Sequence, residues 1–526
     1  MLLCSPLFYY DELPFTSDVT LQIKSGLYML DNTTLFDENS LVNGDIFSWY
    51  NVSWIPHEQG WYLALALAYK AGGCIGVVWL SSVIGFITVS ICIYVARIKQ
   101  KSSVASTVIV LLFSNALLGL PGISYRPDTV SLLLLSIELF TLFYYDNKII
   151  KGVCLVLCSL LTAWFHGGII SIVLLVLVVY ICTSFIYDRN LKSLSINLVI
   201  MLLTFCASLY TNVGFNIWTY NSKQSMYPEL RKYQGEWQAG TFEVLLIMFL
   251  LCILIGLLST KVTSMDKNQL LVLSYFCMFI VGYCIYIRIG RQLNIVLLMF
   301  APKALDNFIT IIKVVLSKAE NNTVVLSKVE NAKELIKKII VIALVPVIII
   351  GNVSKIKSVS SKDINEALYI YGYDLDCVDF IKEKKYERLY VPMNYSTMFI
   401  WNDIKTATDM RWDPFLKSVS GIDYMHNKFL INNPIHLKMY VDEFNPDSLL
   451  FAYKVTDGIT ISGEQYEKTN EIECLIDELD SKYADEYLKV YDNISVSHSK
   501  SIDSNGNTIY TEGTNRFRWV LYEPIK

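Results

Sequence analysis

The amino-acid sequence predicts a mostly α-helical membrane protein: a polytopic helix bundle of about ten spans, followed by a smaller α/β or α+β domain. Two observations carry this prediction. Hydrophobic residues make up 53% of the 526-residue chain and charged residues 17%, whereas soluble domains carry about 25% charged residues. The apolar residues are concentrated in long runs before residue 354, after which polar residues increase. The predicted domains are therefore 1–72, 73–353 and 354–526.

Residues 1–72 are predicted to form a first extracytoplasmic loop and a juxtamembrane helix. The opening run MLLCSPLFYY is too short to cross a bilayer, so we expect either a start site placed too late or a truncated gene. The following stretch, as far as WIPHEQGW, is rich in acidic and aromatic residues. A linker beside a membrane does not need so many acidic and aromatic residues, and their number indicates a functional loop.

Apolar runs of about 18–25 residues with few charges are typical of transmembrane helices. The predicted spans are 73–96, 103–120, 129–146, 149–165, 168–187, 193–213, 241–259, 269–287, 290–312 and 337–353. The span 290–312 contains Lys303 and Asp306, whose spacing of three would let them pair on one helical face.

The Lys and Arg residues of the short loops predict the orientation of the bundle. Fifteen of them fall in one alternate set of loops and six in the other. By the positive-inside rule, the richer set faces the cytoplasm. Both the N-terminal segment and the C-terminal domain are then extracytoplasmic, and the protein is a multi-pass protein of the cell membrane.

The C-terminal domain, 354–526, combines strand-like and helix-like patterns. SLLFAYKV and RFRWVLYEP have the β-branched and aromatic content of strands. EIECLIDELDSKYADEYLKVY has helical spacing of its apolar residues. A disulfide between Cys377 and Cys474 is an open alternative that their spacing alone does not decide. The net charge of −4 argues against a nucleic-acid partner.

Acids and arginines are predicted to gather on the outer side of the membrane, a pattern that suits glycosyl transfer from a phosphate-linked lipid. Such a reaction needs a base for the acceptor hydroxyl and positive charge for the leaving phosphate. The candidate catalytic acids are Asp18 and Asp45. The candidate substrate-binding residues are His57, Glu58, Arg126, His166, Arg288 and Arg291.

Each candidate acid also has a purely structural interpretation. Asp18 precedes a stretch with helical spacing and would serve as an N-cap. Asp45 follows a glycine and would be a turn residue. His57 and Glu58 precede an apolar helix, whose N-terminus favours an acid. The sequence leaves both interpretations open for each of them.

The same holds for the basic candidates. Arg126 precedes a proline at a helix start. In a structural role it would cap that helix or extend its charged end to the membrane interface. His166 lies in a tight turn, AWFHGG, where a bond to the backbone is the structural alternative. Arg288 and Arg291 would be either interfacial anchors or a phosphate clamp.

The order of several motifs resembles bacterial membrane proteins of the GT-C glycosyltransferase superfamily, over nearly the whole chain. These motifs are SDVTLQIKSGLYML, NGDIFSW, WIPHEQGW, GGCIGVVWL, SYRPDTVSLLLL, AWFHGG, IRIGRQLNIVLLMFAP and MNYSTMFIWNDIKTATDMRWDPF. The last contains an Asp-x-Arg pair, Asp409 and Arg411. The resemblance implies transfer from a polyprenyl-phosphate sugar outside the cytoplasmic membrane, with a base-like Asp in the first loop that corresponds to Asp18.

The sequence therefore predicts an inverting glycosyltransferase that moves a sugar from a polyprenyl-phosphate donor to an envelope glycan, lipid or protein. No cofactor is assigned with certainty, and a divalent metal is a candidate. Two other functions stay open. One is a non-enzymatic component of polysaccharide export or a flippase on a related scaffold. The other is a sensor whose C-terminal domain binds cell-wall material.

Overall fold

The structure is a computed structural model in which the chain forms two compact units, each described here by itself. The described residues are 18–32, 45–50, 54–118, 124–226, 238–240, 243–259, 265–319, 363–409, 411, 415, 431–455, 460–461, 464–465, 471–502 and 507–525. Of these, unit 1 contains His57–Gly60 and the residues from Trp79 to Ala319. Unit 2 contains the residues before His57, the stretch Trp61–Val78 and the residues from 363 onward.

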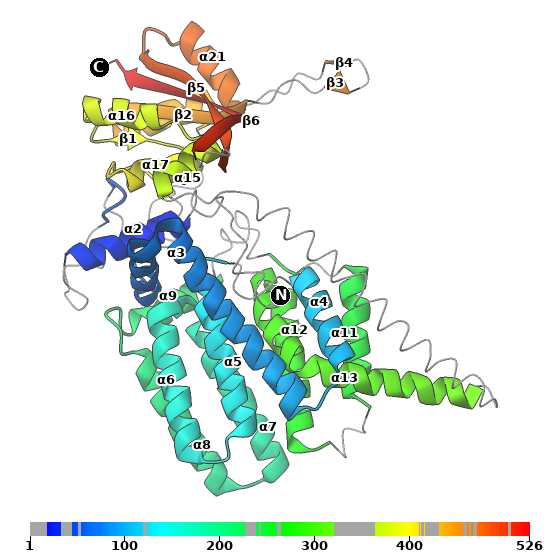
Figure 1. Ribbon diagram of the computed structural model, residues 1–526. Helices are drawn as coiled ribbons and strands as arrows, with labels where there is room; N and C mark the ends of the chain where they lie inside the picture. Colours follow the sequence, from blue (N-terminus) through cyan, green and yellow to red (C-terminus); the bar gives the residue numbers. More distant parts are fainter. Residues whose placement is uncertain are drawn as a thin grey trace. The chain divides into compact units, whose positions relative to one another are not determined.

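Unit 1 is a bundle of helices, most of them apolar (Figure 1). In chain order they are the later part of α3 (Gln59–Tyr94), α4 (Val104–Leu118), α5 (Asp128–Tyr144), α6 (Lys148–His166), α7 (Ile170–Asp188), α8 (Leu191–Ser208), α9 (Asn216–Met226), α11 (Val244–Leu257), α12 (Lys267–Ile285) and α13 (Gly290–Ala319). Their facing side chains form one core, in which Leu139, Tyr275 and Met299 are fully buried. Burial of this apolar surface holds the helices together.

Among the described residues, five apolar helical stretches are long enough to cross a membrane. They are Gln59–Lys99, Lys148–Asp188, Leu191–Ser208, Lys267–Ile285 and Ile287–Val315. Two shorter apolar helices are Val104–Ser114 and Val244–Leu257. The predicted spans from 73–96 to 290–312 each overlap a helix, and 337–353 lies outside the described residues. The prediction of a mostly helical chain is confirmed, while the number of spans stays a prediction.

Asp306 in α13 binds the start of α4 rather than remaining within its own helix. Its carboxylate accepts hydrogen bonds from the backbone N–H of Ser103 at 2.6 Å and from the hydroxyls of Ser103 and Ser106, both at 2.7 Å. The pairing with Lys303 that the sequence suggested is therefore not needed to satisfy this carboxylate. An acceptor at a helix N-terminus satisfies N–H groups that lack helical partners.

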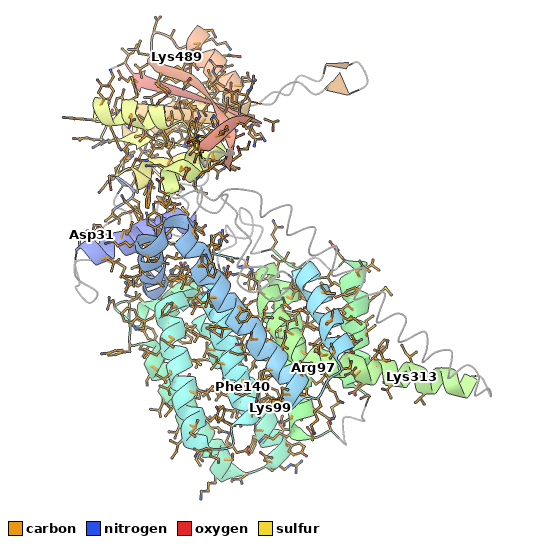
Figure 2. All side chains as sticks on the ribbon, viewed as in Figure 1. Asp31, Arg97, Lys99, Phe140, Lys313 and Lys489 are labelled. Carbon is orange, nitrogen blue, oxygen red and sulfur yellow. The ribbon has the colours of Figure 1, made fainter. Side chains whose placement is uncertain are left out.

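The end of α3 carries basic side chains among aromatic rings. A π-helical turn, η3 (Val95–Lys99), follows α3. The guanidinium of Arg97 donates to the carbonyl of Ser102, and the ammonium of Lys99 lies 5.3 Å from the ring centre of Tyr144. Phe140 lies in the same region (Figure 2). Aromatic and basic residues together are typical of a membrane interface.

Unit 2 combines a four-stranded sheet with short helices. The strands are β1 (Leu389–Tyr390), β2 (Ser448–Val455), β5 (Tyr487–Ile502) and β6 (Thr508–Pro524), in the order β1-β2-β6-β5. β1 and β2 are parallel, and the other pairs are antiparallel. The helices are α2 (Asp18–Asp31), the early part of α3, α15 (Ile364–Tyr371), α16 (Leu375–Lys384), α17 (Ser396–Trp401), α20 (Pro434–Phe444) and α21 (Glu471–Ser481). A small hairpin joins β3 (Thr460–Ile461) and β4 (Glu464–Gln465).

The segment around Ser48 extends the β1 edge of this sheet, although it lies far away in the sequence. Ser48 forms a parallel bridge with Thr406, which in turn bridges Leu389 of β1. The backbone N–H of Trp49 donates to Thr406 at 3.2 Å, and that of Thr406 donates to Phe47 at 3.0 Å. The early loop is therefore part of the same folded unit as the C-terminal residues.

Helix α2 packs closely on the early part of α3 because Gly26 has no side chain. A Cβ atom on Gly26 would lie 2.0 Å from the carbonyl oxygen of Tyr62 and 2.7 Å from Cβ of Ala66. Elsewhere in unit 2, Cys377 is buried and Cys474 is exposed, and both are free thiols. The disulfide between them, left open by the sequence, is absent.

Candidate functional site

Glu58 lies between two histidines at the start of α3. Its Oε1 is 3.4 Å from Nε2 of His57 and 3.9 Å from Nε2 of His166, the last residue of α6. Burial alone would raise the pKa of Glu58, but the hydrogen bond from His57 and the charges of both histidines outweigh it, so the pKa lies below its usual value. Glu58 is therefore an ionised carboxylate at neutral pH.

Backbone contacts fix the turns that carry these side chains. The N–H of Gly167 donates to the carbonyl of His57 at 2.8 Å. A Cβ atom on Gly167 would lie 2.1 Å from Cδ1 of Ile217 and 2.9 Å from the carbonyl oxygen of His57, so glycine allows this close approach. The ring of His57 stacks on Tyr220, with their centres 4.4 Å apart. The start of α3 and the α6–α7 turn are thus held together.

His166 connects Glu58 to a second acid, Asp128. Nδ1 of His166 is 2.6 Å from Oγ of Ser131 and 3.5 Å from Oδ1 of Asp128. Because the Ser131 hydroxyl donates to the carbonyl of Pro127, this arrangement favours the tautomer with a proton on Nδ1. His166 therefore contacts the side chains of Ser131 and Asp128, and its role in substrate binding stays a prediction.

Asp128 in turn forms an ion pair with Arg291 at the start of α13. The Asp128 side chain is 15% exposed and that of Arg291 36%. Arg126 and Arg288 are also close enough to act on the charge of Asp128. Acids, histidines and arginines that are far apart in the sequence thus form one connected cluster in unit 1.

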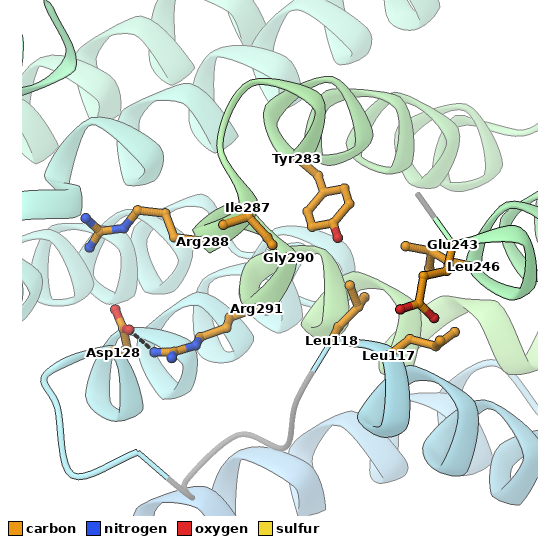
Figure 3. Close-up of a pocket in the computed structure, with 10 residues that line it drawn as sticks. All are labelled: Leu117, Leu118, Asp128, Glu243, Leu246, Tyr283, Ile287, Arg288, Gly290 and Arg291. Carbon is orange, nitrogen blue, oxygen red and sulfur yellow. Dashed lines mark hydrogen bonds and ion pairs between the residues drawn. The ribbon is translucent and has the colours of Figure 1, made fainter. Parts of the chain in front are cut away.

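A cavity of about 320 Å³ opens beside this cluster (Figure 3). It is lined by Leu117, Leu118, Asp128, Glu243, Leu246, Tyr283, Ile287, Arg288, Gly290 and Arg291. Two guanidinium groups lie beside one carboxylate at one side, whereas the leucines form an apolar wall. This combination suits a ligand with an anionic group attached to an apolar chain.

The wall of the cavity is fixed by contacts between α12 and the segment before α11. The N–H of Gly240 donates to the carbonyl of Tyr283 at 3.0 Å, and that of Ile287 donates to Gln238 at 2.8 Å. A Cβ atom on Gly240 would lie 2.5 Å from the Tyr283 ring. Gly290 lines the cavity, and a Cβ atom there would lie 3.0 Å from the same ring. Glycine at both positions leaves room for Tyr283.

The eight candidates from the sequence divide between the units. The structure brings together in unit 1 the six that were expected to bind substrate: His57, Glu58, Arg126, His166, Arg288 and Arg291. Asp18 and Asp45 belong to unit 2. Asp18 is the first residue of α2, where an acid is favourable in any case. Its catalytic role stays a prediction.

Asp45 is held in a buried ion-pair cluster in unit 2. Its two carboxylate oxygens lie 2.8 and 2.9 Å from Nη2 of Arg411, which also contacts Asp409 at 2.5 Å. The side chains of Asp45 and Asp409 are fully buried. Burial raises the pKa of Asp409 although Arg411 opposes this, and the two acids raise the pKa of Arg411.

The backbone of the early loop also forms hydrogen bonds to Asp45. Its Oδ1 accepts the N–H groups of Phe47 at 2.9 Å and Ser48 at 3.2 Å, as expected of a turn residue. The guanidinium of Arg411 lies 5.0 Å from the ring centre of Phe47 and 4.5 Å from that of Trp54. These contacts tie the early loop to Arg411, and a catalytic role of Asp45 stays a prediction.

A metal site is not apparent in the part of the chain that the structure describes. There, no group of three or more His, Cys, Asp or Glu side chains is arranged to hold a metal ion. Those residues therefore offer no arrangement of side chains for the divalent metal that the sequence left as a candidate.

Sequence reasoning missed four residues of the site: Asp128, Ser131, Glu243 and Tyr283. Asp128 had a signal, because it follows Arg126 and Pro127 at a helix start. Ser131 lies three positions later, on the same helical face. Nothing in the sequence pattern indicates that Glu243 and Tyr283 line the cavity, since their approach depends on the contact between Gly240 and α12.

No protein-family model matches the sequence, and no curated protein matches it. Solved structures do match. The apo Archaeoglobus fulgidus oligosaccharyltransferase gives a TM-score of 0.54 at 9% identity, covering 91% of this chain and 76% of that chain. The archaeal oligosaccharyltransferase AglB from Archaeoglobus fulgidus, in complex with an inhibitory peptide and a dolichol-phosphate, gives 0.53 at 10% identity, covering 95% and 70%. This chain has the GT-C fold.

The fold that the resemblance in the sequence implied is therefore confirmed. The similarity extends over both units, since the matches cover at least 91% of this chain. At such low identity a shared fold does not by itself assign an activity. The cluster and the cavity of unit 1 are the features that point to a function.

Proposed function

We propose that this GT-C protein is a membrane glycosyltransferase that moves a sugar from a polyprenyl-phosphate donor to an acceptor at the outer face of the cytoplasmic membrane. The observation that carries the proposal is the cavity in which Arg288 and Arg291 lie beside an apolar wall. The fold supports it. So does the presence of a dolichol-phosphate in the solved AglB complex.

In this proposal, the donor phosphate binds to Arg288 and Arg291. A guanidinium donates two parallel hydrogen bonds to a phosphate and carries a permanent charge. Leu117 and Leu118, on the α4 side of the same cavity, contact the first part of the polyprenyl chain. As the bond between sugar and phosphate breaks, negative charge grows on the phosphate, and both arginines stabilise the transition state.

Asp128 positions Arg291 through their ion pair, and His166 positions Asp128. Charges held by fixed partners need little rearrangement during the reaction, which is what transition-state stabilisation requires. Glu58, ionised and flanked by His57 and His166, accepts hydrogen bonds from hydroxyl groups of the acceptor. The cluster therefore orients substrate and does not react with it.

The transfer itself is a single displacement with inversion. The acceptor oxygen attacks the anomeric carbon, the bond from that carbon to the phosphate oxygen breaks, and the polyprenyl phosphate leaves with the bonding electrons. Asp18 is the proposed base that takes the acceptor proton, as the sequence predicts. Asp45 is given no catalytic role, because Arg411 and the loop backbone occupy its carboxylate.

The experiment measures the rate of sugar transfer by the full-length protein in proteoliposomes. These contain a radiolabelled polyprenyl-phosphate sugar and an envelope glycan, lipid or protein acceptor. Arg288→Gln and Arg291→Gln should each reduce kcat by about 10²-fold, as loss of one transition-state donor does. Arg189→Gln is the matched control, since Arg189 is exposed at the end of α7. Wild-type rates in both cavity variants would refute the phosphate site.

A separate variant tests the base. Asp18→Asn keeps the size of the side chain and removes its ability to accept a proton. Transfer should fall steeply in this variant while donor binding stays unchanged. Equal transfer by wild type and Asp18→Asn would remove Asp18 from the mechanism without affecting the phosphate site.

A further inference from the structure

Glu243 is an acid in the cavity that the proposed reaction does not use. It precedes α11 at the N-cap position, yet its side chain makes no capping hydrogen bond. Instead, it lines the cavity together with Tyr283 and the two arginines. Figure 3 shows its carboxylate on the opposite side of the cavity from Arg288, with Tyr283 between them.

The cavity therefore has two charged ends with an apolar region between them. One end carries Arg288 and the ion pair of Arg291 with Asp128, and the other carries Glu243. Glu243 is also close enough to Tyr283 to interact with its hydroxyl electrostatically. Glu243 is exposed, so a ligand in the cavity can reach its carboxylate directly. A simple anionic ligand would occupy only the arginine end.

The arrangement around Glu243 suits a primary ammonium group in particular. An ammonium group has three donors and no acceptor. The carboxylate of Glu243 and the hydroxyl of Tyr283 are acceptors, and the face of the Tyr283 ring attracts a cation as well. Glu243 comes from the α11 side, and the contact of Gly240 with Tyr283 brings the two together.

We propose that the cavity selects a donor whose sugar carries a free amino group, with the phosphate on Arg288 and Arg291 and the ammonium on Glu243 and Tyr283. This assignment rests on the proposed function, because it names the donor class of the same cavity. The shared chemistry, a phosphate a short distance from a primary ammonium, also occurs in phosphatidylethanolamine. The two sources differ in the sugar ring between the charges.

The experiment measures equilibrium binding to the full-length protein in phosphatidylcholine nanodiscs. Two radiolabelled probes are compared at a pH where the free amine is protonated. One is polyprenyl phosphate carrying 4-amino-4-deoxyglucose, whose amine lies across the ring from the phosphate, and the other is its N-acetyl derivative. Wild type should bind the amino donor about tenfold more tightly than the N-acetylated donor. This ratio corresponds to one hydrogen bond between charged groups, at the weak end of their usual range. Glu243→Gln should abolish this preference. Asp146→Asn, at an exposed loop acid, should retain it.

The outcomes separate this inference from the proposed function. Equal binding of the two probes by wild type overturns the inference, and so does a preference that survives Glu243→Gln. Because the comparison of probes on wild type requires no variant, poor folding of Glu243→Gln leaves the test intact. Phosphatidylethanolamine nanodiscs should not reduce binding of the amino donor, and full displacement there would assign the cavity to the lipid headgroup instead. Selective binding without transfer from any donor would refute the transferase and leave the inference standing.

Discussion

The carboxylate of Asp128 pairs with the guanidinium of Arg291, which lies 163 positions later in the chain. The pair joins the first turn of α5 to the first turn of α13. One side of Asp128 faces His166 and the other faces the cavity. A single carboxylate thus connects the histidines around Glu58 with the arginines of the proposed phosphate site.

Asp128→Asn should impair both stability and transfer. Asparagine removes the charge opposite Arg291, and a lost charge-assisted hydrogen bond costs about 1–3 kcal/mol. Unfolding of the purified protein in detergent should occur at a lower temperature, and the KM for the donor should change together with kcat as Arg291 loses its position. Asp146→Asn serves as the control. Full stability with unchanged kinetics would show that Arg291 needs no partner.

The stability contributed by Glu58 should depend on pH in a defined direction. Its pKa in the folded protein is lowered from the usual 4.5. The contribution is therefore complete above pH 4.5 and is lost as the pH falls through the lower, folded-state pKa. The difference in unfolding temperature between wild type and Glu58→Gln should shrink as the pH falls below the usual value of 4.5. A difference that grows on acidification below that pH would contradict the lowered pKa.

Asp45→Ala should destabilise unit 2 rather than slow a chemical step. Removing one partner of a buried ion pair costs about 3–5 kcal/mol, and Arg411 is only 8% exposed. Limited proteolysis should cleave the variant faster than wild type. The protein that remains folded should retain its specific transfer activity. Loss of transfer with normal resistance to protease would instead make Asp45 part of the reaction.

Gly26→Ala should separate α2 from α3. The added Cβ would overlap the carbonyl oxygen of Tyr62, and overpacking of this kind costs about 1–3 kcal/mol. Gly152→Ala is the matched control within a helix, because its Cβ would lie an ordinary 3.4 Å from Ile200. Thermal unfolding should show a loss for the first variant and none for the second. Equal unfolding temperatures would argue against the close packing.

The sequence allowed the prediction of much of the fold because bilayer spans require long apolar runs. Even the irregular α13, with Pro302 inside it, is long and apolar enough to recognise. The sequence did not allow us to predict which residues of different helices contact each other. Asp306 illustrates this, since its true partners, Ser103 and Ser106, lie two hundred positions away, whereas local spacing favoured Lys303.

In the candidate site, too, single residues could be predicted and their contacts could not. His57, Glu58, His166 and Arg288 could be selected from their residue types and their positions beside predicted spans. Their grouping around Asp128 depends on how the helices pack, which the sequence does not state. Local pattern also could not show what the Asp45 side chain binds. Its partner Arg411 lies 366 positions later.

The hydrogen bond from Ser48 to Ala407 spans 359 positions, and this separation affects the order of events during translation. At about 5–20 residues per second, a ribosome needs roughly 20–70 s to make that length of chain. For that time the early segment exists without the strand neighbour that completes it. Newly made protein would therefore pass through a stage with an unmatched sheet edge, a natural binding site for chaperones and a point of attack for quality-control proteases.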